Sequence, residues 1–225
     1  MTTFTVVVLS AGLGQPSSTR MLADQLAGSA RRAADDRGDR IEVIGVELRE
    51  LAHDIADHLL TGFPSPQLRT ALDAVGSADA LIAVTPVFSA SYSGLFKSFF
   101  DVLGPTALAG TPVALAATGG SARHSLVLDY GLRPLFGYLK AAPVPTAVFA
   151  ATADFGSDEA GRSLAERVDR AGRELVAMLA AAPLSVPADV PRPRQAGTAP
   201  ASPRRGLHAD PFDDLVPFEK LLARR

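Results

Sequence analysis

Five short apolar runs alternate with longer stretches whose apolar residues recur at helical spacing. Several of these runs are apolar without alternation, which is typical of strands that are covered on both faces. The expected strands are residues 5–9, 41–46, 80–84, 113–117 and 146–150. The expected helices are residues 18–35, 49–60, 66–77, 94–103, 124–140 and 158–181.

This order of strands and helices predicts an α/β fold with a parallel sheet and helices on both of its faces. Five strands favour the flavodoxin-like order 2-1-3-4-5 over the six-stranded dinucleotide-binding fold. In such sheets the ligand lies beyond the carboxyl ends of the strands, where the strand order switches. The loops that follow Leu9, Val84 and Ala117 are therefore the candidate ligand loops.

The pattern changes near residue 183, and the predicted organisation is one domain over residues 1–182 followed by a tail over 183–225. The last 43 residues contain eight of the 17 prolines, so the tail is expected to be extended. It ends in a short apolar segment with helix-like spacing. A helix docked on its own domain or on a sister subunit is favoured there over a docking motif for another protein.

Composition narrows the function further. A formal charge of −2 gives no indication of a nucleic-acid or membrane partner. The absence of cysteine excludes disulfides and thiolate chemistry, and the first residues lack the basic start of a signal peptide. A cytoplasmic location is therefore expected.

The first loop, SAGLGQPSSTR, begins like a dinucleotide fingerprint and then departs from it. No third glycine follows, and no Gly-Lys-Ser/Thr follows either. One hydroxyl would only cap the next helix. Four hydroxyls, together with the amides of a helix start, favour a site for a phosphate monoester. They belong to Ser10, Ser17, Ser18 and Thr19.

The second and third loops add a wall and a glycine turn. Phe88 and Ser91 combine apolar bulk with a hydroxyl, which suits a flat heteroaromatic ring. The apolar face of the helix at 94–103 is expected in the core or at a subunit interface. The turn Thr118-Gly119-Gly120-Ser121 offers backbone amides. Histidine spacing supports no metal site, and no G-x-S-x-G supports a hydrolase.

Taken together, the three loops make residues 4–181 resemble the NAD(P)H-dependent FMN reductase family, which has a flavodoxin-like fold. The quoted motifs are SAGLGQPSSTR, TPVFSASYSGLFKSFFD and ATGGSARHSLVLDYGLRP. The resemblance is greatest to reductases that supply reduced FMN to luciferase-like, two-component monooxygenases. It implies FMN and NADPH or NADH as cofactors, a homodimer or homotetramer, and a flavin-dependent monooxygenase as partner.

The same resemblance implies roles for individual residues. Ser10, Ser17, Ser18 and Thr19 would bind the FMN phosphate, and Pro16 would shape their loop. Pro86, Val87, Phe88 and Ser91 would line the flavin, and Thr118, Gly119, Gly120 and Ser121 would bind its pyrimidine edge. Two positions depart from the family pattern. Gln15 occupies the stretch where an arginine is common, leaving Arg20 as a partial substitute, and Phe88 stands where tyrosine is frequent.

The expected reaction is hydride transfer from NAD(P)H to FMN, with no protein residue needed as acid or base. Three alternatives stay open from the residues alone. They are a quinone or azo reductase with tightly bound FMN, a flavodoxin-like electron carrier, and a non-catalytic binding module. Oxidation of NADPH and NADH with and without free FMN would separate them.

Overall fold

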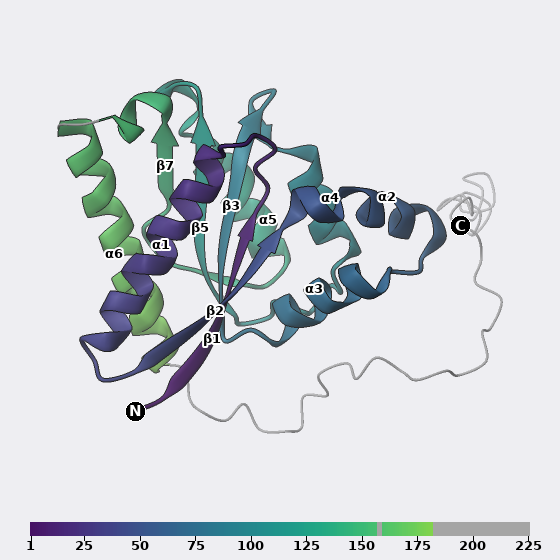
Figure 1. Ribbon diagram of the computed structural model, residues 1–225, viewed down its shortest axis with the longest axis horizontal. Helices are drawn as coiled ribbons and strands as arrows, with labels where there is room; N and C mark the ends of the chain where they lie inside the picture. Colours follow the sequence, from purple (N-terminus) through teal and green to yellow (C-terminus); the bar gives the residue numbers. More distant parts are fainter. Residues whose placement is uncertain (157–158, 182–225) are drawn as a thin grey trace, which may run out of the picture. The chain divides into compact units, whose positions relative to one another are not determined.

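A computed structural model describes residues 1–156 and 159–181. The predicted tail at 183–225 lies outside the described residues, and the domain boundary before it stays a prediction. Within the described part, the strands form one sheet with β3 at its centre (Figure 1). The strands are β1 Thr3–Ser10, β2 Arg40–Glu47, β3 Ala80–Phe88, β4 Ser91–Tyr92, β5 Pro112–Gly119, β6 Ala142–Pro143 and β7 Val148–Ala151.

The spatial order β2-β1-β3-β5-β6 confirms the predicted flavodoxin-like topology, and all of these neighbours pair in parallel. The fifth predicted strand, 146–150, corresponds to β7. A short further strand, β6, precedes it, and both pair with β5. Pro143 and Pro145 lack a backbone N–H, so they cannot donate to a continuous ladder across this stretch.

Helices cover both faces of the sheet, as the alternation predicted (Figure 1). The regular helices are α1 Ser18–Asp35, α2 Ala52–Thr61, α3 Pro66–Ser77, α4 Gly94–Val102, α5 Arg133–Tyr138 and α6 Glu159–Ala181. Short turns of other helix types complete them: η1 Leu48–Leu51, η2 Ala122–His124, η3 Leu128–Leu132 and η4 Thr152–Phe155. None of the described helices is long and apolar enough to span a membrane.

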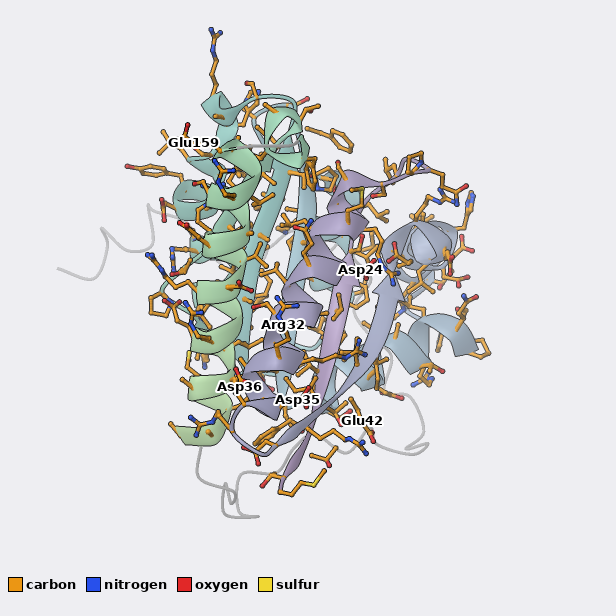
Figure 2. The ribbon with its side chains drawn as sticks, turned by 60° about the vertical axis from the view of Figure 1, so that its left-hand side comes forward. Asp24, Arg32, Asp35, Asp36, Glu42 and Glu159 are labelled. Carbon is orange, nitrogen blue, oxygen red and sulfur yellow. The ribbon has the colours of Figure 1, made fainter. Side chains whose placement is uncertain are left out.

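One face of the sheet packs against α1 and α6, which lie side by side in both views (Figures 1 and 2). Their contact is close, because a Cβ at Gly172 of α6 would lie 2.3 Å from Ser29 Oγ of α1. An ion pair of 2.8 Å between Arg32 and Asp169 also joins the two helices at the surface. α1, which begins directly after the first loop, is thus held against the sheet together with α6.

The opposite face packs against α2, α3, α4 and α5. Phe96, Phe99 and Phe100 of α4 are buried in this core, and Phe100 meets Phe136 of α5 edge to face with centroids 5.0 Å apart. The apolar face of α4 is therefore core of this chain. Both cores leave the carboxyl ends of β1, β3 and β5 together at one edge, which positions the three loops.

Candidate functional site

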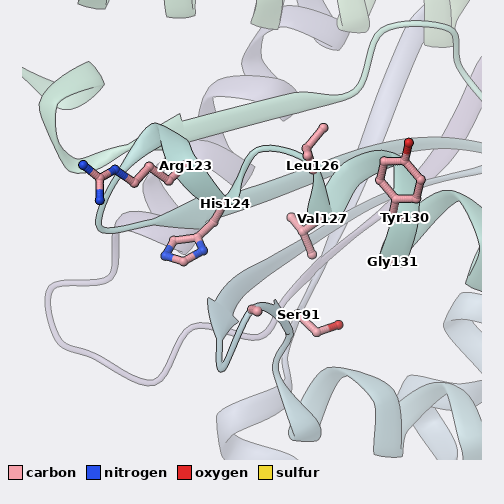
Figure 3. A pocket seen from close by; sticks show the side chains of 8 residues that line it. Ser91, Arg123, His124, Leu126, Val127, Tyr130 and Gly131 are labelled. Atoms are coloured by element: carbon pink, nitrogen blue, oxygen red, sulfur yellow. The ribbon is translucent and has the colours of Figure 1, made fainter.

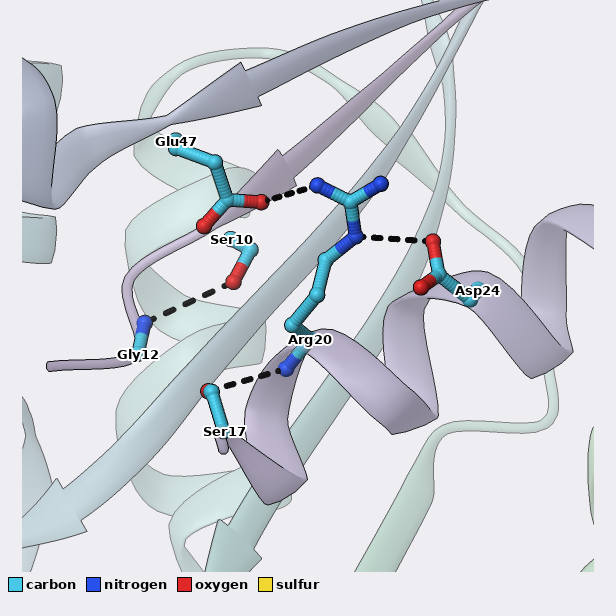
Figure 4. A network of polar contacts seen from close by, with 6 residues as sticks. All are labelled: Ser10, Gly12, Ser17, Arg20, Asp24 and Glu47. Carbon is cyan, nitrogen blue, oxygen red and sulfur yellow. Dashed lines mark hydrogen bonds and ion pairs between the residues drawn. The ribbon is translucent and has the colours of Figure 1, made fainter. Parts of the chain in front are cut away.

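The first loop leads from the buried end of β1 into α1. Ser10 is fully buried, and its Oγ accepts a long hydrogen bond of 3.5 Å from the Gly12 N–H (Figure 4). Ser17 is the N-cap of α1, because its Oγ accepts from the Arg20 N–H at 3.2 Å. The hydroxyl of Ser17 thus has the capping role that the sequence left open as an alternative to ligand binding.

The start of α1 keeps donors available for an anion. The amides of Ser18 and Thr19 are the first of the helix and have no acceptor among the described residues. Gly12 is required for the loop to close over them, since a Cβ there would lie 2.1 Å from Ser17 Oγ. Free amides, the exposed hydroxyl of Ser18 and a close backbone approach fit a phosphate group.

A hydrogen bond between two threonines joins the first loop to the third. Thr19 Oγ1 and Thr118 Oγ1 are 2.8 Å apart, and both residues are buried. Only one proton is needed for this bond, so the other hydroxyl keeps its own proton for a further acceptor. Two residues predicted for opposite ends of the ligand site are therefore in direct contact.

Arg20 does not take the place of the missing loop arginine. Its Nε lies 2.8 Å from Asp24 and one Nη lies 2.6 Å from Glu47 of β2 (Figure 4). These hydrogen bonds, to Asp24 first and then to Glu47, raise the pKa of the Arg20 guanidinium above its ordinary value. Arg20 is thus neutralised by two carboxylates beside the loop.

A different arginine contacts the loop, and the sequence analysis missed it. Arg49 of η1 donates to the carbonyl oxygen of Leu13 at 3.3 Å. Its two terminal nitrogens also lie 3.1 and 2.5 Å from the side-chain oxygen of Gln15. The Gln15 amide is oriented with its oxygen toward Arg49, because the reverse orientation would place its NH2 group against the N–H groups of Arg49. Arg49 is far from the loop in sequence, and only the pairing of β1 with β2 brings it there.

The second loop is a tight hairpin formed by β3 and β4. The strand continues through Pro86 to Phe88, beyond its expected range of 80–84. Ser89 and Ala90 form the turn with φ of 49° and 69°, a left-handed conformation that is unusual for residues with a Cβ. Strained turns of this kind are found at ligand sites. Phe88 remains 48% exposed at this edge of the sheet.

A pocket of about 210 Å³ lies between this hairpin and the helical turns that follow the third loop (Figure 3). Ser91 is the predicted flavin residue that lines it, and Gly131 of the π-helical turn η3 packs closely against β4. A π-helical turn is rare and often occurs at functional sites. The lining residues are Ala90, Ser91, Arg123, His124, Leu126, Val127, Tyr130 and Gly131.

The third loop begins where β5 lies between β3 and β7. Thr118 is in register with Pro86 of β3, which places the predicted pyrimidine-edge and flavin-wall residues next to each other. A Cβ at Gly119 would lie 2.9 Å from the ring of Phe149, so glycine is needed there. Gly120 is exposed and Ser121 is half-buried. The predicted site residues therefore share one edge of the sheet, although Pro16 and Ser18 have no side-chain partner among the described residues.

Comparison with known proteins agrees with this arrangement. The sequence profile of a family described as NADPH-dependent FMN reductase matches residues 4–156. A Pseudomonas aeruginosa protein named FMN reductase (NADPH) is 40% identical over 152 residues, which are 68% of this chain and 79% of that protein. The NADH-dependent FMN reductase SfnE of Pseudomonas putida is 37% identical over 181 residues, 80% of this chain and 95% of that protein.

A solved structure of similar sequence supports the same relationship. It is an oxidoreductase from Corynebacterium diphtheriae, which superimposes with a TM-score of 0.77 at 47% identity. The matched region covers 80% of this chain and 98% of that structure. Sequence and three-dimensional similarity therefore extend over the sheet, the three loops and the helices that support them.

Proposed function

Because the chain belongs to the NADPH-dependent FMN reductase family and is an NAD(P)H:FMN oxidoreductase, we propose that its three loops form the FMN site. The hydrogen bond between Thr19 and Thr118 carries this proposal. It holds the start of α1 and the end of β5 together, so donors from the first and third loops lie at one place. The strand ends of β1, β3 and β5 fix the remaining loop positions.

The FMN phosphate is assigned to the first loop. The amides of Ser18 and Thr19 and the hydroxyls of Ser10, Ser17 and Ser18 supply neutral donors there, and Pro16 shapes the turn. Thr19 contributes through its contact with Thr118. A phosphate at a helix start also interacts favourably with the partial positive charge of the helix dipole.

The flavin ring is assigned to the space between the second and third loops. Pro86, Val87, Phe88 and Ser91 form the wall on one side, and the amides of Gly119, Gly120 and Ser121 face the pyrimidine edge with Thr118. Fixed backbone dipoles at this edge favour negative charge there. When bound, FMN supplies the hydride-accepting chemistry, and the chain supplies position and electrostatics.

The pyridine nucleotide is assigned to the exposed side of the site. The pocket beside Ser91 has a volume of about 210 Å³, so it holds only part of a dinucleotide. The exposed edge at Phe88 leaves room for the nicotinamide to approach the flavin. An open site also suits a reduced flavin that leaves as product. We therefore assign the chain to the supply of reduced FMN to a flavin-dependent monooxygenase, as a homodimer or homotetramer.

Oxidation of NADPH and of NADH, measured at 340 nm with and without free FMN, tests this function. We expect the rate to saturate with added FMN, because the flavin is a substrate. A rate that needs a quinone and does not respond to free FMN would assign a different acceptor. If neither pyridine nucleotide is oxidised under any condition, the proposed function is wrong.

A further inference from the structure

The first loop offers a bound phosphate neutral donors and the positive end of the α1 dipole, and its one cationic side chain, Arg20, is paired with carboxylates. Arg20, Asp24 and Glu47 together form a cluster with one positive and two negative groups, and this cluster lies beside the start of α1. The donors of the proposed phosphate site are neutral amides and hydroxyls. A phosphate monoester carries a charge of about −1.5 to −2 at pH 7. A side-chain cation from outside the loop would therefore add to the stabilisation that the helix dipole gives.

Arg49 is a cation that touches this loop and is not neutralised. Its hydrogen-bond partners are the Leu13 carbonyl and the Gln15 amide oxygen, which are both uncharged. No carboxylate of the described residues forms an ion pair with it. Arg49 is exposed, yet its guanidinium is held by two residues of one loop. Its position is therefore fixed while its charge remains available.

The guanidinium also keeps donors free. An arginine has five N–H groups, and the contacts to Leu13 and Gln15 use three of them. Two N–H groups remain for another acceptor. Gln15 suits this arrangement better than an arginine would, since an amide oxygen accepts from Arg49 whereas a second guanidinium would repel it.

We propose that Arg49 supplies the positive charge for the FMN phosphate and that Gln15 positions it. This inference rests on the assignment of FMN to the three loops, and it names the residue that discriminates FMN from flavins without a phosphate. Arg49 thus replaces, from the turn after β2, the arginine that the first loop lacks. Gln15 acts as a positioning residue through Arg49.

Binding of FMN and of riboflavin to the full chain tests the inference, because the two flavins share a ring and differ in the phosphate. Flavin fluorescence quenching gives both dissociation constants. We expect Arg49→Gln to weaken FMN binding about tenfold, as the loss of charge-assisted hydrogen bonds does, with riboflavin affinity unchanged. Arg49→Lys keeps the charge without the planar fork and should fall between Arg49→Gln and the unchanged chain.

Arg37→Gln is the matched control. Arg37 is an exposed arginine in the turn between α1 and β2, at the amino ends of the strands, so its loss changes net charge equally without touching the loop. The Arg37→Gln variant should prefer FMN over riboflavin as strongly as the unchanged chain does. Thermal melting of each variant establishes that the fold is kept.

Two results would overturn the role of Arg49. Arg49→Gln could keep the full preference for FMN, or it could weaken both flavins equally, which would indicate a structural role. Failure of the proposed site gives a different result. The unchanged chain would then bind FMN no better than riboflavin, and the phosphate would have no site on the first loop at all.

Discussion

Ser17 and Ser18 are neighbours at the start of α1 but have different surroundings. We therefore expect Ser17 to contribute to stability and Ser18 to FMN binding. Ser17 caps the helix through the Arg20 amide, whereas Ser18 is exposed and has no side-chain partner among the described residues. Both serines were singled out from the sequence, because N-cap preference and a run of hydroxyls are local signals, but which of them caps the helix was not. Arg49 could not be found in this way, since 36 residues separate it from Leu13.

We expect Ser17→Ala to lower the free energy of unfolding by about 1 kcal/mol, because the Arg20 N–H loses its acceptor. Ser18→Ala should leave stability within about 0.5 kcal/mol and weaken FMN binding roughly tenfold, as a lost hydrogen bond to a charged group does. Urea unfolding and FMN titration of both variants measure these effects. Unchanged FMN affinity in Ser18→Ala would remove Ser18 from the site.

The starts of two helices followed local capping signals in the sequence. α1 and α3 begin after capping serines, and both match the predicted ranges. The predicted helix at 124–140 is instead divided into η2, η3 and α5. Pro134 has no N–H for an intrahelical bond, and η3 packs against β4. Helical periodicity alone does not reveal such a tertiary constraint.

The contact between α1 and α6 gives a prediction that reverses the usual helix preference. Glycine to alanine inside a helix normally stabilises by up to about 1 kcal/mol. In Gly172→Ala the new Cβ would lie 2.3 Å from Ser29 Oγ and 2.9 Å from the backbone nitrogen of Ala30. We expect this variant to lose about 2 kcal/mol of unfolding free energy in chemical denaturation, because the two helices must move apart.

Gly28→Ala in α1 is the matched control for that experiment. The nearest atom to its new Cβ is a terminal nitrogen of Arg32 at 3.5 Å, which is an ordinary contact with a flexible side chain. This variant should be as stable as the unchanged chain or slightly more so. A Gly172→Ala variant that behaves like Gly28→Ala would show that the helix pair accommodates the methyl group.

At the scale of the whole molecule, the sheet order and the edge that carries the ligand were predictable from alternation and chain length. Few topologies are possible, because the crossover connections between parallel strands of one sheet are almost always right-handed. The short additional strand β6 and the contact between Thr19 and Thr118 were not predictable. Both depend on how distant segments meet after the sheet has formed.

Since the proposed FMN site draws on loops from three strands, ligand binding should stabilise the whole described domain. FMN at one hundred times its dissociation constant adds about 2.7 kcal/mol to the free energy of unfolding. For a domain of this size we expect a rise in Tm of roughly 5–10 °C. Riboflavin at the same concentration should raise Tm less. Equal shifts with both flavins would contradict phosphate binding by the first loop.

The position of β1 between β2 and β3 has a consequence for synthesis on the ribosome. β1 is the first strand to emerge, but one of its two sheet neighbours, β3, begins only at Ala80. One backbone edge of β1 thus stays unpaired until that segment has been translated. The hydrogen bond of Thr19 can form only later still, because its partner Thr118 lies 99 residues further along the chain. A nascent chain released before β5 therefore exposes an unpaired, aggregation-prone strand edge and has no complete flavin site.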